Sequence, residues 1–282
     1  MTAERTYRFR DGKKLTLGGR TLVMGILNVT PDSFSDGGRW NTRDSALRHM
    51  EEMVRDGADI IDIGAESSRP GFVPMSAAEE IERLLPFLET ILAECPVPVS
   101  VDTFKAETAR AALDAGTHML NDIWGLQYAE EPGAMARVAA EADVPVVVMH
   151  NQNGTAYSGD IIGAMRTFFA CAFARADAAG LARENLILDP GIGFGKTAEQ
   201  NMHVLRRMDE LISYDGTDYP VLLGASRKSF IGAALDLPVE ERMEATGAAC
   251  VMGIERGASI VRVHDVKPIV RMCRMTDAIL GA

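Results

Sequence analysis

Residues 24–38 read MGILNVTPDSFSDGG, an apolar run that changes abruptly to short polar side chains. Asn28 and Asp36 offer oxygen atoms, which are the ligands that magnesium prefers, and Phe34 is the one aromatic residue in the stretch. The same residue types also form ordinary turns. The polar part is about ten residues long, however, and long loops on a rigid scaffold are often functional. The length therefore favours a ligand-binding loop.

Polar side chains also follow several later apolar runs. Asp102, Asn121 and Asp189 carry carboxylate and amide groups, which suit a flat heterocycle with amino and lactam edges. Lys228 could bond to a ring oxygen or nitrogen, and Arg262 could stack its guanidinium on the ring face. Each residue also has a structural alternative, because Asp102 could cap a helix and Asn121 could bridge two strands.

A second set of residues suits an anion. In a barrel of parallel strands, Asn28, Arg262 and His264 would lie at neighbouring strand ends, near the usual phosphate site. The helix expected to begin near Ser229 would present free backbone N–H groups to a carboxylate or a phosphate. Asn28 and Asp36 could hold a Mg²⁺ ion that bridges a pyrophosphate. No cluster of cysteine and histidine suggests zinc.

The glycine-rich sequence GIGFGKT occupies residues 191–197. It lacks the GxxxxGK[ST] spacing of a nucleotide P-loop, and it follows a late strand instead of opening a dinucleotide-binding unit. We interpret it as a strand-to-helix loop whose glycines allow close approach of a ligand, with Phe194 as a wall of the pocket.

A repeating unit must position these residues. At intervals of about 30 residues, a helix-like stretch ends at Gly or Asp, a short apolar run follows, and the run ends in a polar residue. Gly57, Gly116 and Gly257 are predicted C-caps, because positive φ is cheap for glycine. The predicted strands are the apolar runs Thr21–Val29, Asp59–Ala65, Pro98–Asp102, His118–Ile123, Pro145–His150, Leu186–Asp189, Pro220–Ala225 and Ser259–Val263.

The apolar runs are continuous instead of alternating, as expected for strands buried on both faces. Together with the amphipathic helices between them, they predict an α/β fold, a single-domain (β/α)8 TIM barrel, in preference to a doubly wound open sheet. Residues 1–20 are predicted to form a hairpin or plug, and residues 21–282 the barrel. The active site is then expected at the carboxyl ends of the strands.

The composition bounds the function. The chain has 282 residues, 47% hydrophobic and 24% charged, which is typical of a globular protein with a sizeable core. Its net charge of -11 argues against nucleic-acid or membrane-surface binding. The four cysteines are scattered without a CxxC pair, and no secretory signal or membrane-spanning run is evident. These features predict a cytoplasmic protein.

Seven segments together resemble the dihydropteroate synthases, a pterin-binding family of folate biosynthesis. In chain order they are NVTPDSFSDGG, ESSRPG, VDT, LND, DPGIGFGK, SRKSFIG and RVHDVKP. The resemblance begins at about Leu22 and covers most of the chain. It implies a TIM-barrel homodimer that joins 6-hydroxymethyl-7,8-dihydropterin pyrophosphate to p-aminobenzoate and releases pyrophosphate, with Mg²⁺ as cofactor.

The resemblance also implies roles for individual residues. The pterin pocket would consist of Asp102, Asn121, Asp189, Lys228 and Arg262. The pyrophosphate would be held by Asn28, Arg69, Arg262 and His264, and the metal by Asn28 and Asp36. The p-aminobenzoate site would consist of Phe34, Ser68, Pro70, Phe194, Lys228 and Ser229. The residues closest to the chemistry would be Asp36, Arg69, Lys228, Arg262 and His264.

The implied mechanism needs no strong protein nucleophile. The pterin methylene carries a good leaving group, and Mg²⁺, Arg262 and His264 would stabilise the departing pyrophosphate. The arylamine then attacks the methylene carbon. We expect the loops that contain Phe34 and Arg69 to close over the substrates and to be mobile without them.

Two departures from the family pattern stand out. Ser68 replaces the usual threonine, so a methyl group that would contact the aminobenzoate, near where sulfonamides bind, is missing. The segment HNQNGTAYSGD, residues 150–160, also differs from the usual forms, and we assign it no catalytic role.

Two alternatives remain at this point. One is a methyltransferase that acts on methyltetrahydrofolate, which would share the VDT, LND and DP segments. It has no reason to keep the loop Phe34–Asp36, the SRPG loop or the pair Lys228 and Ser229. The other is a catalytically silent, pterin-binding paralogue. The intact functional residues argue against it, namely Asp36, Arg69, Lys228, Arg262 and His264.

Overall fold

The predicted apolar runs become the parallel strands of a closed barrel in the computed structural model, which describes residues 4–29, 42–66 and 75–281. Around the barrel the strands follow chain order, and β12 pairs with β3 to close it. The predicted TIM barrel is therefore confirmed. Its strands are β3 (Leu22–Asn28), β4 (Ile60–Gly64), β5 (Val99–Asp102), β6 (Met119–Asp122), β7 (Val146–Met149), β8 (Leu186–Asp189), β11 (Val221–Leu223) and β12 (Ala258–Val263).

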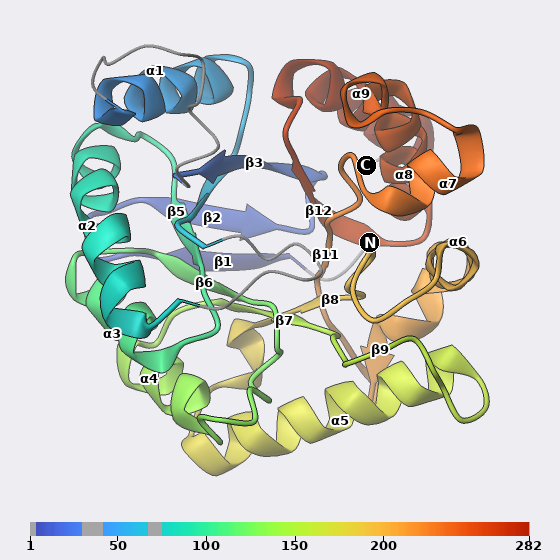
Figure 1. Cartoon of the computed structure of the whole chain (residues 1–282), viewed down its shortest axis with the longest axis horizontal. Coiled ribbons are helices and arrows are strands. Elements are labelled where there is room, and N and C mark those ends of the chain that lie inside the picture. The colour runs from blue at the N-terminus through green and yellow to red at the C-terminus, as the bar shows by residue number, and fades with distance from the viewer. Residues whose placement is uncertain (1–3, 30–41, 67–74, 282) are drawn as a thin grey trace.

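Helices surround the barrel and return the chain from one strand to the next (Figure 1). A capping box of Ser76 and Glu79 opens α2. The glycines predicted as C-caps also adopt positive φ, with +103° at Gly57, +109° at Gly116 and +94° at Gly257. The helices are α1 (Thr42–Arg55), α2 (Ala77–Glu94), α3 (Ala106–Asp114), α4 (Ala134–Ala142), α5 (Ile161–Ala179), α6 (Ala198–Arg206), α7 (Ser229–Leu235), α8 (Met243–Glu255) and α9 (Val266–Leu280).

The N-terminal end of the barrel is filled by apolar side chains. There β1 (Arg5–Arg8) and β2 (Lys14–Leu17) form an antiparallel hairpin. Tyr7, Leu15 and Leu17 of this hairpin belong to one buried cluster with strand residues. The strand members of the cluster are Leu22, Met24, Ile60, Met119, Val147, Ile187, Leu222 and Ile260. Because this layer is packed, the carboxyl end of the barrel is the open end for a ligand.

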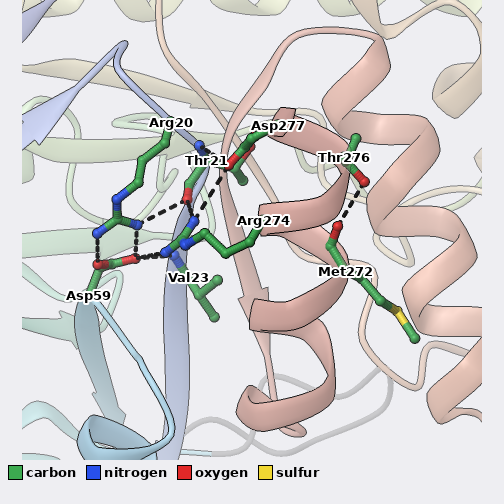
Figure 2. Close-up of polar contacts among 8 residues, drawn as sticks. All are labelled: Arg20, Thr21, Val23, Asp59, Met272, Arg274, Thr276 and Asp277. Atoms are coloured by element: carbon green, nitrogen blue, oxygen red, sulfur yellow. Dashed lines mark hydrogen bonds and ion pairs between the residues drawn. The ribbon is translucent and has the colours of Figure 1, made fainter. Parts of the chain in front are cut away.

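A polar network fastens the last helix to the N-terminal end of β3 (Figure 2). Asp277 on α9 accepts hydrogen bonds from the backbone nitrogen (3.1 Å) and the hydroxyl (2.7 Å) of Thr21. Asp59, directly before β4, pairs with Arg20 and accepts from the Val23 backbone nitrogen at 2.9 Å. Arg274 completes the network with a 2.7 Å bond to the Thr21 carbonyl. These contacts give this end of the barrel a structural role.

The remaining elements are short. A hairpin of β9 (Ser213–Tyr214) and β10 (Thr217–Asp218) precedes β11, and 3-10 turns span Arg183–Asn185, Met208–Leu211 and Val239–Glu241. Within the described ranges, no helix has the length and apolar character needed to cross a membrane. The four cysteines are free thiols, and of these only Cys171 is exposed.

Candidate active site

A cavity opens at the carboxyl ends of the strands. All five residues predicted to bind the heterocycle contribute to its wall, together with Phe194. Strand geometry explains the convergence, because alternate residues share a face: Arg262 lies two residues after the inward Ile260, and Asp189 two after Ile187. The lining is Asp102, Asn121, Ile123, Met149, Asp189, Ile192, Phe194, Gly224, Lys228 and Arg262.

A larger cavity, of about 540 Å³ against about 30 Å³, lies at the opposite end, beneath the N-terminal hairpin. Two of its charged groups already have partners in the protein, since Arg20 pairs with Asp59 and Lys13 with Asp11. The smaller cavity holds the convergent acids and bases, so we place the candidate site there and not in the larger space.

Arg262 is held between two carboxylates in the small cavity. Its Nε donates to Asp62 Oδ2 at 2.6 Å, and its Nη2 donates to Asp102 Oδ2 at 2.8 Å. Asp62 is fully buried and also accepts from Asn121 Nδ2 at 3.1 Å. The two acids therefore fix the plane of the guanidinium before any ligand arrives.

Burial sets the protonation of the acids and the lysine in the site. It raises the pKa of Asp102 to about 7, although Arg262 opposes the shift. It also raises the pKa of Asp189 to about 6, although Asp189 Oδ1 accepts from the Gly191 backbone nitrogen at 2.7 Å. Burial and the charge of Arg262 lower the pKa of Lys228 to about 8. Three groups are thus poised near neutral pH, which is common where a site binds or reacts with polar ligands.

Lys228 and Phe194 form one wall of the cavity. The Lys228 ammonium lies 4.1 Å from the centre of the Phe194 ring, in a cation–π contact. Lys228 occupies the N-cap position of α7, and the exposed Ser229 is the first residue of that helix. A side chain at Gly193 would place its Cβ 2.9 Å from Lys228 Cδ, so the glycine makes room for the lysine.

His264 and Asn28 stand beside this cavity. The Ser226 hydroxyl accepts from the His264 backbone nitrogen at 3.2 Å and lies 2.9 Å from His264 Nδ1. The hydroxyl keeps one proton that it can donate to Nδ1, and in the tautomer that this contact matches, Nε2–H is a donor to a ligand. Burial, with Arg262 and Arg227 nearby, lowers the pKa of His264 to about 4. Asn28 ends β3, half-buried, next to Gly64 of β4.

Gly191 and Gly195 allow close approach of another segment of the same chain, and the predicted approach of a ligand stays a prediction. A Cβ at Gly191 would lie 1.9 Å from the His150 carbonyl oxygen, and one at Gly195 would lie 2.7 Å from Gln152. Both residues also adopt positive φ, +65° and +54°. The segment after β7 therefore packs directly against the glycine-rich loop, and glycine at these two positions makes that contact within the chain possible.

Several predicted residues fall outside the part of the chain that the structure describes. They are Phe34, Asp36, Ser68, Arg69 and Pro70. Across residues 4–29, 42–66 and 75–281, no group of three or more His, Cys, Asp or Glu side chains is arranged to hold a metal ion.

Sequence reasoning missed Asp62 and Ser226. We considered the last residues of each strand, whereas Asp62 lies two residues before the end of β4. It is a charged residue inside the apolar run IIDIG, and it lies two residues after Ile60, so its side chain shares the inward face of the strand. That position is a signal that would have identified it. Ser226 carries no comparable signal, because a serine before a helix is usually a cap or part of a turn.

Comparison with known proteins gives a consistent picture. The profile of the family described as pterin binding enzymes matches residues 24–264. The dihydropteroate synthase of Bacillus subtilis (strain 168) is 52% identical over 262 residues, which cover 93% of this chain and 90% of that protein. The one from Clostridium beijerinckii is 48% identical over 269 residues, covering 95% of this chain and 97% of that protein.

Solved structures of the same enzyme are also similar. Dihydropteroate synthase from Clostridium difficile, in the presence of pteroic acid, has a TM-score of 0.88 at 48% identity and covers 93% of this chain and 98% of that chain. The Xanthomonas albilineans enzyme with 4-aminobenzoic acid has a TM-score of 0.90 at 38% identity and covers 99% of this chain and 100% of that chain.

Proposed function

The chain belongs to the pterin binding enzymes and, among them, to the dihydropteroate synthases, and from this premise we propose how its residues divide the work. It is a transferase that joins 6-hydroxymethyl-7,8-dihydropterin pyrophosphate to p-aminobenzoate, giving 7,8-dihydropteroate and pyrophosphate. The observation that carries the proposal is the convergence of Asp102, Asn121, Asp189, Lys228 and Arg262 on one cavity.

The pterin ring is proposed to bind in that cavity. Asp102 and Asp189 offer acceptors to the amino and ring N–H groups, while Asn121 and Lys228 offer donors to ring oxygen and nitrogen atoms. Arg262 lies against the ring, with its plane already fixed by Asp62 and Asp102. A preorganised guanidinium loses less freedom when the ligand binds, which supports this assignment.

The pyrophosphate is proposed to be held by Asn28, Arg69, Arg262 and His264. The Ser226 hydroxyl supports the part of His264, because it can donate to Nδ1 of the neutral ring whose Nε2–H donates to a phosphate oxygen. Arg262 supplies a permanent positive charge beside it.

Magnesium is proposed to bind at Asn28 and Asp36. Of these, Asn28 offers an amide oxygen at the rim, next to Gly64, and the described residues form no three-acid cluster. This donor set fits magnesium, which often takes one or two protein oxygens and completes its shell with phosphate oxygens and water. When bound, the ion would neutralise charge on the pyrophosphate.

The p-aminobenzoate is proposed to bind against Phe34, Ser68, Pro70, Phe194, Lys228 and Ser229. The contact between Lys228 and Phe194 supports a flat aromatic acid here, because the ring would face Phe194 while its carboxylate meets the ammonium. A sulfonamide drug complex is known for the similar Yersinia pestis dihydropteroate synthase, and we propose that sulfonamides compete at this site. Ser68 would then influence their affinity.

The proposed reaction is a displacement at the pterin methylene carbon. The bond from that carbon to the pyrophosphate oxygen breaks, and its electron pair leaves with the pyrophosphate. Arg262 and the Nε2–H of His264 stabilise the charge that develops on the leaving oxygens. The arylamine nitrogen then forms the new C–N bond and loses a proton. The protein contributes orientation and electrostatics, not a covalent intermediate.

We also propose a homodimer formed through α6, α7 and α8. These neighbouring helices expose the apolar side chains of Met202, Leu235, Val251 and Met252. Exposed apolar groups on adjacent elements often mark a protein interface. The partners would otherwise be small molecules, with no nucleic acid or membrane.

Two organisational points remain proposals. We propose that residues 1–20 are an extension and that residues 21–282 are one pterin-binding domain. A cytoplasmic location is proposed from the free thiols, of which Cys171 is exposed.

A single assay tests the function. Purified protein is incubated with Mg²⁺, the pterin pyrophosphate and p-aminobenzoate, and pyrophosphate release is followed with each component omitted in turn. We expect release only when both substrates are present. Measurable pterin binding without release would favour the silent paralogue, and methyl transfer from methyltetrahydrofolate would favour the methyltransferase.

A further inference from the structure

Lys196 is a buried lysine that the proposed chemistry does not use. Only 8% of the residue is exposed, and its ammonium has three acceptors. They are His150 Nδ1 at 2.9 Å, the Gly191 carbonyl at 2.9 Å and the Phe194 carbonyl at 3.0 Å. An ammonium has three N–H donors, so each of them is satisfied.

These acceptors belong to two segments that meet at the cavity. His150 directly follows β7, whereas Gly191 and Phe194 belong to the glycine-rich loop after β8. Two carbonyl oxygens of one short loop converge on a single cation, and the loop is thereby pinned to the end of the neighbouring strand. Phe194, whose ring meets Lys228, lies inside the pinned segment.

The segment after β7 braces the same loop from outside. The Tyr157 hydroxyl donates to the Gly195 carbonyl at 2.7 Å. On the other side, the Gly193 backbone nitrogen donates to Asn201 Oδ1 at 2.7 Å. The residues to either side of Phe194 are therefore held by separate partners, and the ring has little freedom to leave the wall of the cavity.

We propose that Lys196 and Tyr157 are positioning residues that fix the glycine-rich loop, keep the Phe194 ring against Lys228, and thereby set the affinity for p-aminobenzoate. The proposal rests on the proposed placement of p-aminobenzoate against Phe194. It gives the segment 150–160 a role as a scaffold for the second substrate.

The protonation of Lys196 follows from the geometry. A neutral amine has two N–H donors and a lone pair, which could accept from Nδ1–H of a neutral His150, so its contacts lose the strength that the positive charge gives and the loop would loosen. Burial lowers the pKa of Lys196 to about 7; Asp189 opposes the shift and Lys228 adds to it. His150 stays neutral, because burial and Lys196 lower its pKa to about 2. The three-point contact is therefore strongest below about pH 7 and weakens as the pH rises through the pKa of Lys196.

The test compares Lys196→Met with Lys267→Met. Methionine fills a similar volume without charge or donors, while Lys267 is an exposed lysine on α9 that pairs with Asp56 and does not line the cavity. For Lys196→Met we expect the KM for p-aminobenzoate to rise about tenfold. This factor corresponds to the free-energy cost of leaving one buried acceptor without a hydrogen bond. The Kd for the pterin pyrophosphate, measured by calorimetry, should change less than about twofold. Lys267→Met should match the wild type in both.

A pH profile separates positioning from general destabilisation. In the wild type, the KM for p-aminobenzoate should contain a rise near pH 7 that is absent from Lys196→Met, in which the KM is already high. Tyr157→Phe keeps the lysine and removes one brace, and it should raise the same KM about threefold, as expected for one neutral hydrogen bond. This second variant keeps the test valid if Lys196→Met fails to fold.

The outcomes are distinct. Equal increases in both substrate constants, or an unchanged KM for p-aminobenzoate in both variants, would overturn the positioning role. Phe194→Leu serves as the reference. If it leaves the KM for p-aminobenzoate unchanged, the proposed aminobenzoate wall is wrong; if it raises that KM while Lys196→Met and Tyr157→Phe do not, only the positioning role is wrong.

Discussion

Replacing Asp62 by asparagine should weaken pterin binding without disturbing the barrel. Asp62 Oδ2 accepts from Arg262 Nε at 2.6 Å and from Asn121 Nδ2 at 3.1 Å, and the side chain is fully buried. Two residues that we assign to the pterin pocket are therefore oriented by one carboxylate. An asparagine has nearly the same shape, and its amide oxygen can take the place of Oδ2, but it carries no charge, so both hydrogen bonds become weaker.

The magnitude follows from the bond that is weakened. A hydrogen bond to a charged group contributes about 1.5–3 kcal/mol, which corresponds to roughly 10-fold to 100-fold in affinity. The like charge of Asp62 also helps to raise the pKa of Asp102, so Asp62→Asn should lower that pKa from about 7. We expect calorimetry to give a pterin Kd raised by about this factor, with the acid limb of pterin binding displaced to lower pH.

Asp59→Asn is the matched control. Asp59 lies three residues earlier at the N-terminal end of the barrel, and it also pairs with arginines, Arg20 and Arg274. Its replacement should lower the melting temperature and leave the pterin Kd unchanged, since its contacts face away from the cavity. A normal pterin Kd in Asp62→Asn, or an equal loss in both variants, would refute the view that Asp62 orients the pocket.

Three further variants probe the same site. Lys228→Ala should raise the KM of both substrates by roughly 10-fold or more, because one charge-assisted contact to each is lost; steady-state kinetics showing an effect on only one substrate would contradict the dual assignment. His264→Gln should retain more activity than His264→Ala, because an amide N–H can replace the Nε2–H donor, and equal activity of the two variants would count against a donor role. Because the pKa of His264 is about 4, the wild-type rate at pH 6–8 should not require a protonated imidazole. Gly191→Ala should lower the free energy of unfolding by about 3 kcal/mol or more, because its Cβ would lie 1.9 Å from the His150 carbonyl oxygen. Gly180 also has positive φ but faces open space, so Gly180→Ala should lower the free energy of unfolding by only about 1 kcal/mol. Equal losses of stability in chemical denaturation would mean that the loop can move aside.

The barrel could be predicted because its signal is local and repeated. Continuous apolar runs, most of them preceded by a helix that ends near a glycine or an acidic residue, mark the strands, and the run Leu186–Asp189 coincides with β8 residue for residue. The parallel connection then leaves few topologies. The polar residues at the strand ends lie in one cavity for two reasons. They are at the carboxyl end of the barrel, and they occupy the alternate strand positions whose side chains point inward.

The rest depends on contacts that sequence spacing does not encode. Lys196 reads as one more residue of a glycine-rich loop, and nothing local shows that its side chain turns inward to His150, 46 residues earlier. The contact partners of the glycines could not be predicted from the sequence either. Their type predicted a close approach, but only the coordinates identify the neighbour at Gly191 as the protein's own backbone.

The fastening of α9 to the start of β3 also bears on how the chain is made. Thr21 and Asp277 are 256 residues apart, and β3 gains its neighbour β12 only when residues 258–263 have been synthesised. At about 5–20 residues per second, the ribosome needs on the order of 10 to 50 s to cover that distance. Throughout this interval β3 presents an unpaired, apolar edge, which is a template for aggregation. The barrel therefore cannot close before its last strand has emerged, and β3 is an edge at which an unfinished chain can aggregate.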